Sequence, residues 1–322
     1  MEQKKTVLIF GLSSFLGSNI AENLKDKYKV VGTYFNTPVN IPGVLSIKCD
    51  VHSKETVQKV VYLFKPDITI YTIGLTDLNG CQEFPKVADA LNTAGVFNVS
   101  MASERYKSKF IYFSSSFIFS GEDITYKEND SPTPTSVYGN TIASSEFYIQ
   151  KSCLNYIIFR CCPIFGRSNN TNDLKWVEAI ERNEFLGQKI SCDNKVYTGF
   201  IDVYTLCDIL DKAIKSNITN KLLQLTSKNI MNRYEFAHHY IEEFGGNTGL
   251  LSKGDWHFPR TENQMAQHNL SDELKFKMDT YNLEKELSMT VPTIEESIKH
   301  YKQKLEGSVG AKKMTGAGIT FI

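Results

Sequence analysis

The chain has 322 residues, and its 36 Lys plus Arg balance its 36 Asp plus Glu, so the formal net charge is zero. A chain of this length buries most of the surface that it exposes when unfolded, in one large α/β domain or two modest ones. The neutral balance gives no sign of a nucleic-acid partner or an anionic membrane. No apolar stretch approaches membrane-spanning length and the first residues show no signal-peptide core, so we expect a cytoplasmic protein.

The cysteine pattern favours a reducing compartment. Seven cysteines are present, an odd number, and no two of them form a C-x-x-C motif. This distribution is typical of reduced thiols in a cytosolic protein. The histidines and cysteines show no zinc-ligand spacing, so we predict no metal site.

In chain order, short apolar runs alternate with amphipathic segments, which is typical of a parallel sheet covered by helices. Strands are predicted at 6–10, 29–35, 44–49, 68–73, 110–113 and 156–160. Helices are predicted at 16–24 and 57–64, and Ser53 is a candidate N-cap for the second. The pattern predicts an α/β fold with a doubly wound parallel Rossmann sheet and a smaller α/β C-terminal substrate region.

Beyond residue 163 the alternation becomes irregular. A polar loop is predicted at 168–173, a helix at 176–180, strands at 189–191 and 195–203 around a turn at 193–194, and a further strand at 222–225. We therefore predict a Rossmann domain over 1–163, which part of 200–225 rejoins. A smaller region over 164–303 and a flexible tail over 304–322 follow it.

The first predicted strand runs directly into a glycine-containing turn and then a helix. Gly11 permits a tight turn and Gly17 permits close packing of helix on strand, so a pyrophosphate would sit against the N–H groups near Phe15 and Leu16. Ser14 stands where such turns have a middle glycine. Its side chain either displaces the pyrophosphate outward or replaces a backbone contact with a hydrogen bond. A plain turn between strand and helix is the alternative interpretation.

The ends of later strands supply further candidate cofactor-binding residues. The second strand ends at Asn36, without the acidic residue that binds an NAD ribose, which favours NADPH over NADH. Asp50, beside Val51, is placed to accept from an adenine amino group, or else to cap the following helix. The candidate set is completed by Ile73, Gly74, Cys162 and Tyr138.

A longer motif begins at the fifth strand. The strand ends in Ser114-Ser115-Ser116-Phe117-Ile118-Phe119-Ser120-Gly121, and Tyr126-Lys127-Glu128-Asn129-Asp130-Ser131-Pro132 and Tyr138-Gly139-Asn140 follow. In order and spacing this segment resembles the dTDP-4-dehydrorhamnose reductase branch of the extended short-chain dehydrogenase/reductases. Residues 92–98, 159–166 and 292–298 also resemble motifs of that branch, so the similarity covers about residues 6–303.

The resemblance implies a Rossmann domain that binds NADPH and a C-terminal region that binds a nucleoside diphosphate sugar. It also implies that Ser115 hydrogen-bonds the substrate carbonyl and that Tyr138 protonates its oxygen, roles that suit two hydroxyl donors. Ile142 stands where the family has its lysine, one helical turn after Tyr138. Ser116 and Ser120 replace two of the family's aspartates.

These departures leave three functions open. The first is NAD(P)H-dependent reduction of a 4-keto-6-deoxy nucleoside diphosphate sugar in polysaccharide biosynthesis. The second is a non-catalytic regulatory or nucleotide-binding member of the same fold family. The third is an epimerase on the same substrates, for which Asp77 and Glu83 are candidate acid and base groups. A homodimer also stays open.

Overall fold

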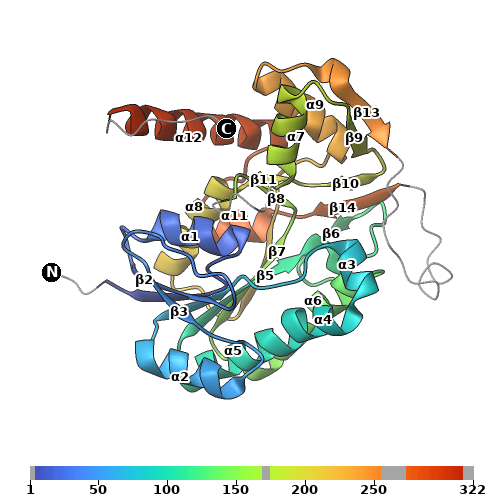
Figure 1. The fold of residues 1–322 in the computed structure, drawn as a ribbon. Helices are drawn as coiled ribbons and strands as arrows, with labels where there is room; N and C mark the ends of the chain where they lie inside the picture. Colours follow the sequence, from blue (N-terminus) through green and yellow to red (C-terminus); the bar gives the residue numbers. More distant parts are fainter. Residues whose placement is uncertain (1–3, 169–174, 255–272, 315–322) are drawn as a thin grey trace.

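The computed structural model describes residues 4–168, 175–254 and 273–314 of the chain (Figure 1). Most of the predicted loop at 168–173 therefore lies outside the described residues, as does the end of the predicted tail. No helix in the described part is long and apolar enough to cross a membrane.

Seven parallel strands form the central sheet of the described residues, in the order β12, β7, β5, β4, β1, β2, β3. Their bounds are β1 Thr6–Phe10, β2 Lys29–Tyr34, β3 Leu45–Lys48, β4 Ile68–Tyr71, β5 Lys109–Ser115, β7 Tyr156–Cys161 and β12 Lys221–Leu225. All of the strands predicted before residue 163 are present, and the doubly wound α/β fold is confirmed.

Helices cover both faces of this sheet (Figure 1). One face carries α1 Phe15–Leu24, α8 Val203–Lys215 and α11 Tyr281–Leu287; the other carries α2 Lys54–Phe64, α5 Gly95–Arg105 and α6 Val137–Ser152. Before α5 come α3 Leu78–Glu83, α4 Pro85–Asp89 and a π-helical turn, η1 Ala90–Ala94. Successive side chains of β1 point to opposite faces of the sheet. Val7 and Ile9 pack in the apolar cluster on one face, and Leu8 and Phe10 pack in the cluster on the other. Ser53 caps α2, as predicted, by accepting the Thr56 N–H at 3.2 Å.

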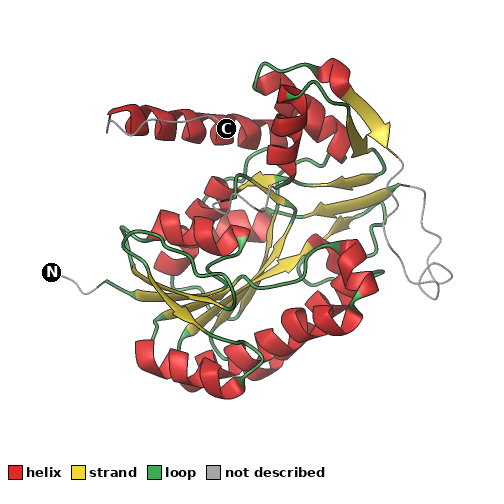
Figure 2. Cartoon of the chain, in the orientation of Figure 1, coloured by secondary structure: helices red, strands yellow, loops and turns green. Residues whose placement is uncertain are grey.

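The second part of the chain builds a smaller region above the sheet (Figure 2). Its helices are α7 Trp176–Phe185, α9 Arg233–Glu243 and α12 Ile294–Met314, with a short turn η3 Thr248–Leu250. Its short strands are β8 Ile164–Phe165, β9 Ile190–Asp193, β10 Val196–Thr198, β11 Ile201–Asp202, β13 Leu251–Gly254 and β14 Leu274–Met278. An aromatic cluster that includes Phe200, Phe236 and Tyr301 forms its core.

Several segments cross between the two parts. Helix α8 lies against α1, and β12 extends the central sheet beside β7. In the opposite direction, β6 Thr125–Tyr126 pairs with β14 of the smaller region. The chain therefore passes from one part to the other more than once.

The structure has a strand on each side of the turn predicted at 193–194. These two strands do not pair with each other: β9 pairs with β13 and β10 with β14. The Asp193 carboxylate accepts the N–H groups of Lys195 (3.0 Å) and Val196 (3.1 Å), which stabilises the turn between the two strands. The predicted strand 195–203 is divided: Gly199 and Phe200 separate β10 from β11, and α8 begins at Val203.

Helix α12 also extends further than expected. It continues to Met314, so the residues predicted as a flexible tail from 304 onward are helical as far as that point. Leu305 lies one turn after the buried Tyr301 and packs on the same aromatic cluster, which continues the apolar face of the helix.

A buried carboxylate joins α8 to α12. Asp202 is fully buried and caps α8 by accepting the N–H groups of Tyr204 and Thr205. The Ser297 hydroxyl donates to the same carboxylate at 2.7 Å, and the half-buried His300 places Nδ1 3.3 Å from it. The hydrogen bond with Asp202 raises the pKa of His300 above its usual value of 6.5.

This shift predicts a pH-dependent contribution to stability. Because the folded-state pKa of His300 is raised, its contribution is complete below pH 6.5 and is lost as the pH rises through the folded value. We expect His300→Asn, which keeps a donor but does not titrate, to be about 0.5–1 kcal/mol less stable than wild type at pH 5.5. The difference in unfolding free energy, measured by urea titration, should shrink by pH 8.5; a constant difference would contradict the prediction.

Candidate active site

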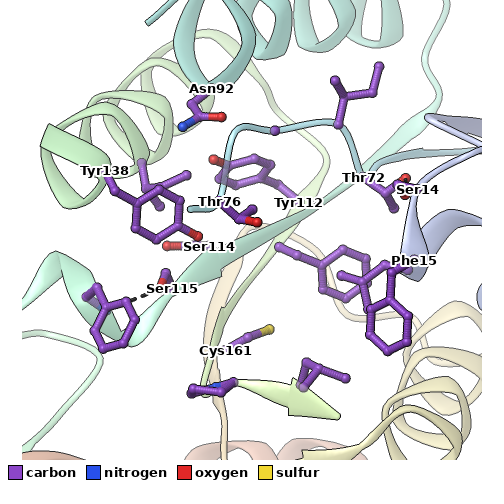
Figure 3. Close-up of a pocket in the computed structure, with 18 of the residues that line it drawn as sticks. Ser14, Phe15, Thr72, Thr76, Asn92, Tyr112, Ser114, Ser115, Tyr138 and Cys161 are labelled. Atoms are coloured by element: carbon purple, nitrogen blue, oxygen red, sulfur yellow. Dashed lines mark hydrogen bonds between the residues drawn. The ribbon is translucent and has the colours of Figure 1, made fainter. Parts of the chain in front are cut away.

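A cavity of about 530 Å³ lies at the carboxyl ends of the central strands, beneath the smaller region. Its wall includes the start of α1, the ends of β4, β5 and β7, and the first turns of α6 (Figure 3). The carboxyl edge of a parallel sheet is the usual ligand site of doubly wound folds. The predicted residues Ser14, Phe15, Leu16, Ile73, Gly74, Ser115, Tyr138 and Cys162 all line it.

The turn between β1 and α1 has the close packing that its glycines predict. Gly11 has φ of +99°, a conformation that side chains disfavour, and a Cβ there would lie 2.7 Å from Ile73 Cγ1. A Cβ on Gly17 would collide with the Gly11 carbonyl oxygen. Both glycines shape the turn, although neither lines the cavity itself.

Ser14 is the N-cap of α1. Its hydroxyl oxygen accepts the Gly17 N–H at 2.9 Å and donates to the Thr72 hydroxyl at 3.0 Å. The Ser14 side chain therefore hydrogen-bonds a backbone N–H of α1, that of Gly17, which would have no such partner if residue 14 were glycine. Among the described hydrogen bonds, the N–H groups of Phe15 and Leu16 have no protein acceptor, so they can bind an anion.

The other predicted cofactor residues lie away from the cavity wall. Asn36 is exposed beyond the end of β2. The Asp50 carboxylate accepts the backbone N–H of His52 at 3.0 Å and contacts its ring nitrogen. The alternative that Asp50 caps the following helix is wrong, because Ser53 caps α2. Val51 is buried, and its carbonyl oxygen accepts from the Asn98 amide.

Tyr138 and Ser115 meet in the cavity from two different elements. Helix α6 begins one residue before Tyr138, where the Ser136 hydroxyl caps it by accepting the Gly139 N–H at 3.1 Å. A Cβ on Gly139 would collide with the Phe117 carbonyl oxygen, so glycine lets α6 pack closely beyond the end of β5. Figure 3 shows the Tyr138 ring directed toward Ser114 and Ser115.

The two hydroxyl groups are suited to donating to a developing oxyanion. Burial raises the pKa of Tyr138 to about 12, while its hydrogen bond with Ser115 acts in the lowering direction. Tyr138 is therefore protonated throughout the neutral range. The Ser115 hydroxyl oxygen also accepts the Phe117 N–H at 3.2 Å. This hydrogen bond orients the hydroxyl so that its own proton points away from Phe117.

Ile142 lies on the next turn of α6 and forms part of the cavity wall, with 5% of its surface exposed. It places an apolar side chain where a cation would contact the tyrosine. The neighbouring lysines do not replace it. Lys151 lies over the Phe147 ring, and Lys127 is exposed; neither lines the cavity.

Sequence reasoning missed many residues of the cavity wall as site residues, and Asn92, Lys175 and Arg233 are among them. Asn92 fixes the loop after β4, since its amide accepts the Leu75 N–H and donates to the Leu75 carbonyl, both at 2.9 Å. The signal that could have identified Asn92 is its position in the segment 92–98, which resembles a motif of the reductase branch. Lys175 and Arg233 enter the wall from the smaller region. No sequence pattern marked these two, because each simply precedes or begins a helix.

The remaining candidates lie outside the cavity. The Ser116 hydroxyl, in the part of the chain that is described, is buried without a partner, and Ser120 donates to the Glu122 carboxylate at 2.8 Å. Asp77 caps α3 by accepting the Gly80 N–H, and Glu83 is exposed. The described residues contain no group of three or more His, Cys, Asp or Glu side chains placed to hold a metal ion.

Comparisons with known proteins agree with this geometry. The family model described as the RmlD substrate binding domain matches residues 5–306. A probable low-salt glycan biosynthesis reductase of Haloferax volcanii is 23% identical over 301 residues, which is 90% of this chain and 95% of that protein. Methionine adenosyltransferase 2 subunit beta of Danio rerio is 22% identical over 72% of each chain.

Solved structures share the fold. The crystal structure of dTDP-4-dehydrorhamnose reductase from Bacillus anthracis, in complex with NADP, superposes with a TM-score of 0.77. The superposition covers 94% of this chain and 100% of that one, at 20% sequence identity. At this identity the likeness establishes the architecture alone.

Proposed function

The chain belongs to the RmlD substrate binding domain family, and from this we propose that it is an NADPH-dependent reductase of a 4-keto-6-deoxy nucleoside diphosphate sugar in polysaccharide biosynthesis. One observation carries the proposal: Ser115 and Tyr138 face the same cavity as the anion-binding start of α1. The relatives named as reductases support the same reaction class.

The cavity suits a dinucleotide cofactor. The N–H groups of Phe15 and Leu16 would hold its pyrophosphate, and Ile73, Gly74 and Cys162 would line its further course. The exposed Asn36 brings no carboxylate to repel a ribose phosphate, which favours NADPH over NADH. When bound, this cofactor supplies the hydride.

Ser115 and Tyr138 provide the remaining chemistry. The Ser115 hydroxyl donates a hydrogen bond to the ketone oxygen and so stabilises the negative charge that develops there. The Tyr138 hydroxyl transfers its proton to the same oxygen, which completes an alcohol. In the direction of reduction Tyr138 acts in its protonated form, so no group is needed to help deprotonate it beforehand. Reduction is therefore less dependent on a neighbouring lysine than oxidation is.

The reaction is tested by following NADPH oxidation with a panel of 4-keto-6-deoxy nucleotide sugars. We expect turnover with at least one of them, and we expect Ser115→Ala to lower kcat about 10²- to 10³-fold, the usual loss of one oxyanion donor. Turnover no higher than that of Ser115→Ala across the panel would reject the proposal.

Restoring a cation at position 142 is predicted to strengthen cofactor binding. A lysine there can hydrogen-bond ribose hydroxyls, and one charge-assisted hydrogen bond is worth about 1.5–3 kcal/mol. We expect Ile142→Lys to lower the Kd for NADPH about tenfold or more in a titration followed by cofactor fluorescence. Ile142→Met, which keeps an apolar side chain, is the matched control. Equal Kd values for the two variants would contradict the prediction.

Two alternatives remain distinguishable. The first is a non-catalytic regulatory role, which would retain dinucleotide binding without turnover; the similarity to a protein named as a subunit of methionine adenosyltransferase is compatible with it. An epimerase would need a second acid or base, and the described residues lining the cavity include no Asp, Glu or His. That composition favours the reductase over the epimerase.

Location and assembly belong to the same proposal. All seven cysteines lie in the described residues as buried free thiols, which supports a reducing, cytoplasmic environment.

A homodimer is the proposed assembly, and exposed Phe97 and Phe147 on α5 and α6 are apolar side chains that a second copy would cover. No nucleic-acid or membrane partner is proposed.

A further inference from the structure

The cavity has a charge that the whole chain lacks. The chain is neutral overall, yet the described residues lining this cavity include two cations, Lys175 and Arg233, and no carboxylate. Both cations come from the smaller region. A cavity of one sign with low-dielectric walls concentrates ligands of the other sign. Anionic ligands therefore suit a cavity that is lined by these cations and by the start of α1.

Lys175 lies next to the anion-binding start of α1. It immediately precedes α7, and its Nζ lies 6.0 Å from the centre of the Phe15 ring. Phe15 is the first residue of α1, and it lines the cavity together with Leu16. The flexible lysine stem lets the ammonium reach an anion bound at that helix end.

Arg233 occupies a second position, across the Trp176 ring. It is the first residue of α9, and Asn232 and Glu235 fix that helix start with a reciprocal capping box. Its guanidinium carbon lies 5.3 Å from the centre of the Trp176 ring, and Asp193 is close enough to interact with it electrostatically. A planar guanidinium held in this way suits bidentate contact with phosphate oxygens.

We propose that Lys175 binds the pyrophosphate of the dinucleotide cofactor and that Arg233 binds the diphosphate of the nucleotide sugar. The assignment rests on the proposed function. The Lys175 ammonium replaces, as a partner of the pyrophosphate, the α1 backbone N–H that already donates to the Ser14 hydroxyl. Arg233 lines the same cavity over the Trp176 ring, and the second diphosphate is assigned to it. The smaller region thus supplies the positive charge for both ligands.

The test measures binding without turnover. Cofactor fluorescence gives the Kd for NADPH, and calorimetry gives the Kd for thymidine diphosphate and uridine diphosphate. We expect Lys175→Met to raise the Kd for NADPH about tenfold and to leave the nucleoside diphosphate Kd within twofold. Arg233→Met should do the reverse. Lys175→Arg, which keeps the charge, should restore most of the NADPH affinity.

Two matched controls remove a cation from the same region outside the cavity. Lys253 lies 5.6 Å from the Tyr234 ring centre, a contact like that of Lys175, and Arg182 is exposed on α7. Lys253→Met and Arg182→Met should change neither Kd. Effects of Lys175→Met and Arg233→Met no larger than those of the controls would overturn the assignment.

Further outcomes separate this assignment from the proposed function. Equal losses of both ligands in both cavity variants, together with a lowered Tm, would indicate a structural role and overturn the assignment. Wild-type protein that binds neither NADPH nor NADH would overturn the proposed function and the assignment together. Normal wild-type binding that is unaffected by Lys175→Met and Arg233→Met would overturn the assignment alone.

Discussion

Replacing Tyr138 by Phe is expected to lower kcat for ketone reduction about 10²- to 10⁴-fold, the usual contribution of a positioned proton donor. The substitution removes one hydroxyl and keeps the ring, whose edge-on contact with Phe117, at 6.5 Å between centroids, needs no hydroxyl. Cofactor affinity should therefore change little. Stopped-flow measurement of NADPH oxidation gives the chemical step, and a fluorescence titration gives the Kd.

The pH dependence provides a second readout of the same group. Because burial raises the pKa of Tyr138 to about 12, its proton-donating form persists across the measurable range, and kcat should not fall between pH 6 and 9. Tyr148→Phe on the exposed side of the same helix is the matched control, and it should leave kcat unchanged. A wild-type kcat that decreases with an apparent pKa near 7 would show that another group donates the proton.

The Rossmann half could be predicted from the sequence because its signals are local. Each strand is a short apolar run, and residues from Gly11 to Gly17 carry the turn geometry within seven positions. The pairing of Ser115 with Tyr138 is not local, since the two residues are 23 positions apart in the sequence. It was predicted through the family-like motif, and the structure brings both residues to one cavity.

The rest of the site could not be predicted because its partners are distant in sequence. The cap that Ser14 provides follows from its position before α1, but its hydrogen bond to Thr72 spans 58 residues. Lys175 and Arg233 reach the cavity only through the packing of the smaller region. Its strands are two to five residues long, too short to carry a periodic signal, and they pair across long separations.

The ion pair behind the catalytic strand gives the largest expected effect on stability. Glu146 on α6 and Arg160 on β7 are 1% and 2% exposed. The Glu146 carboxylate accepts from Arg160 Nε at 3.0 Å and Nη2 at 2.8 Å, and from the Ser114 hydroxyl at 2.5 Å. Arg160 donates further to the Glu128 carbonyl at 3.1 Å. The pair therefore joins α6 to β5 and β7, next to Ser115.

Glu146→Ala is expected to lower the free energy of unfolding by about 3–5 kcal/mol, because it leaves the Arg160 guanidinium buried without its counterion. Urea unfolding measures the loss against Glu55→Ala, which breaks an exposed helix pair with Lys59 and should cost at most about 0.5 kcal/mol.

The double variant Glu146→Leu with Arg160→Met separates the unpaired charge from the packing. Removing both charges takes away the cost of desolvating them, so this variant should be more stable than Glu146→Ala. A loss for Glu146→Ala no larger than that for Glu55→Ala would contradict the prediction. Should the double variant recover stability but not kcat, the pair is needed to hold α6, and hence Tyr138, in its position opposite Ser115.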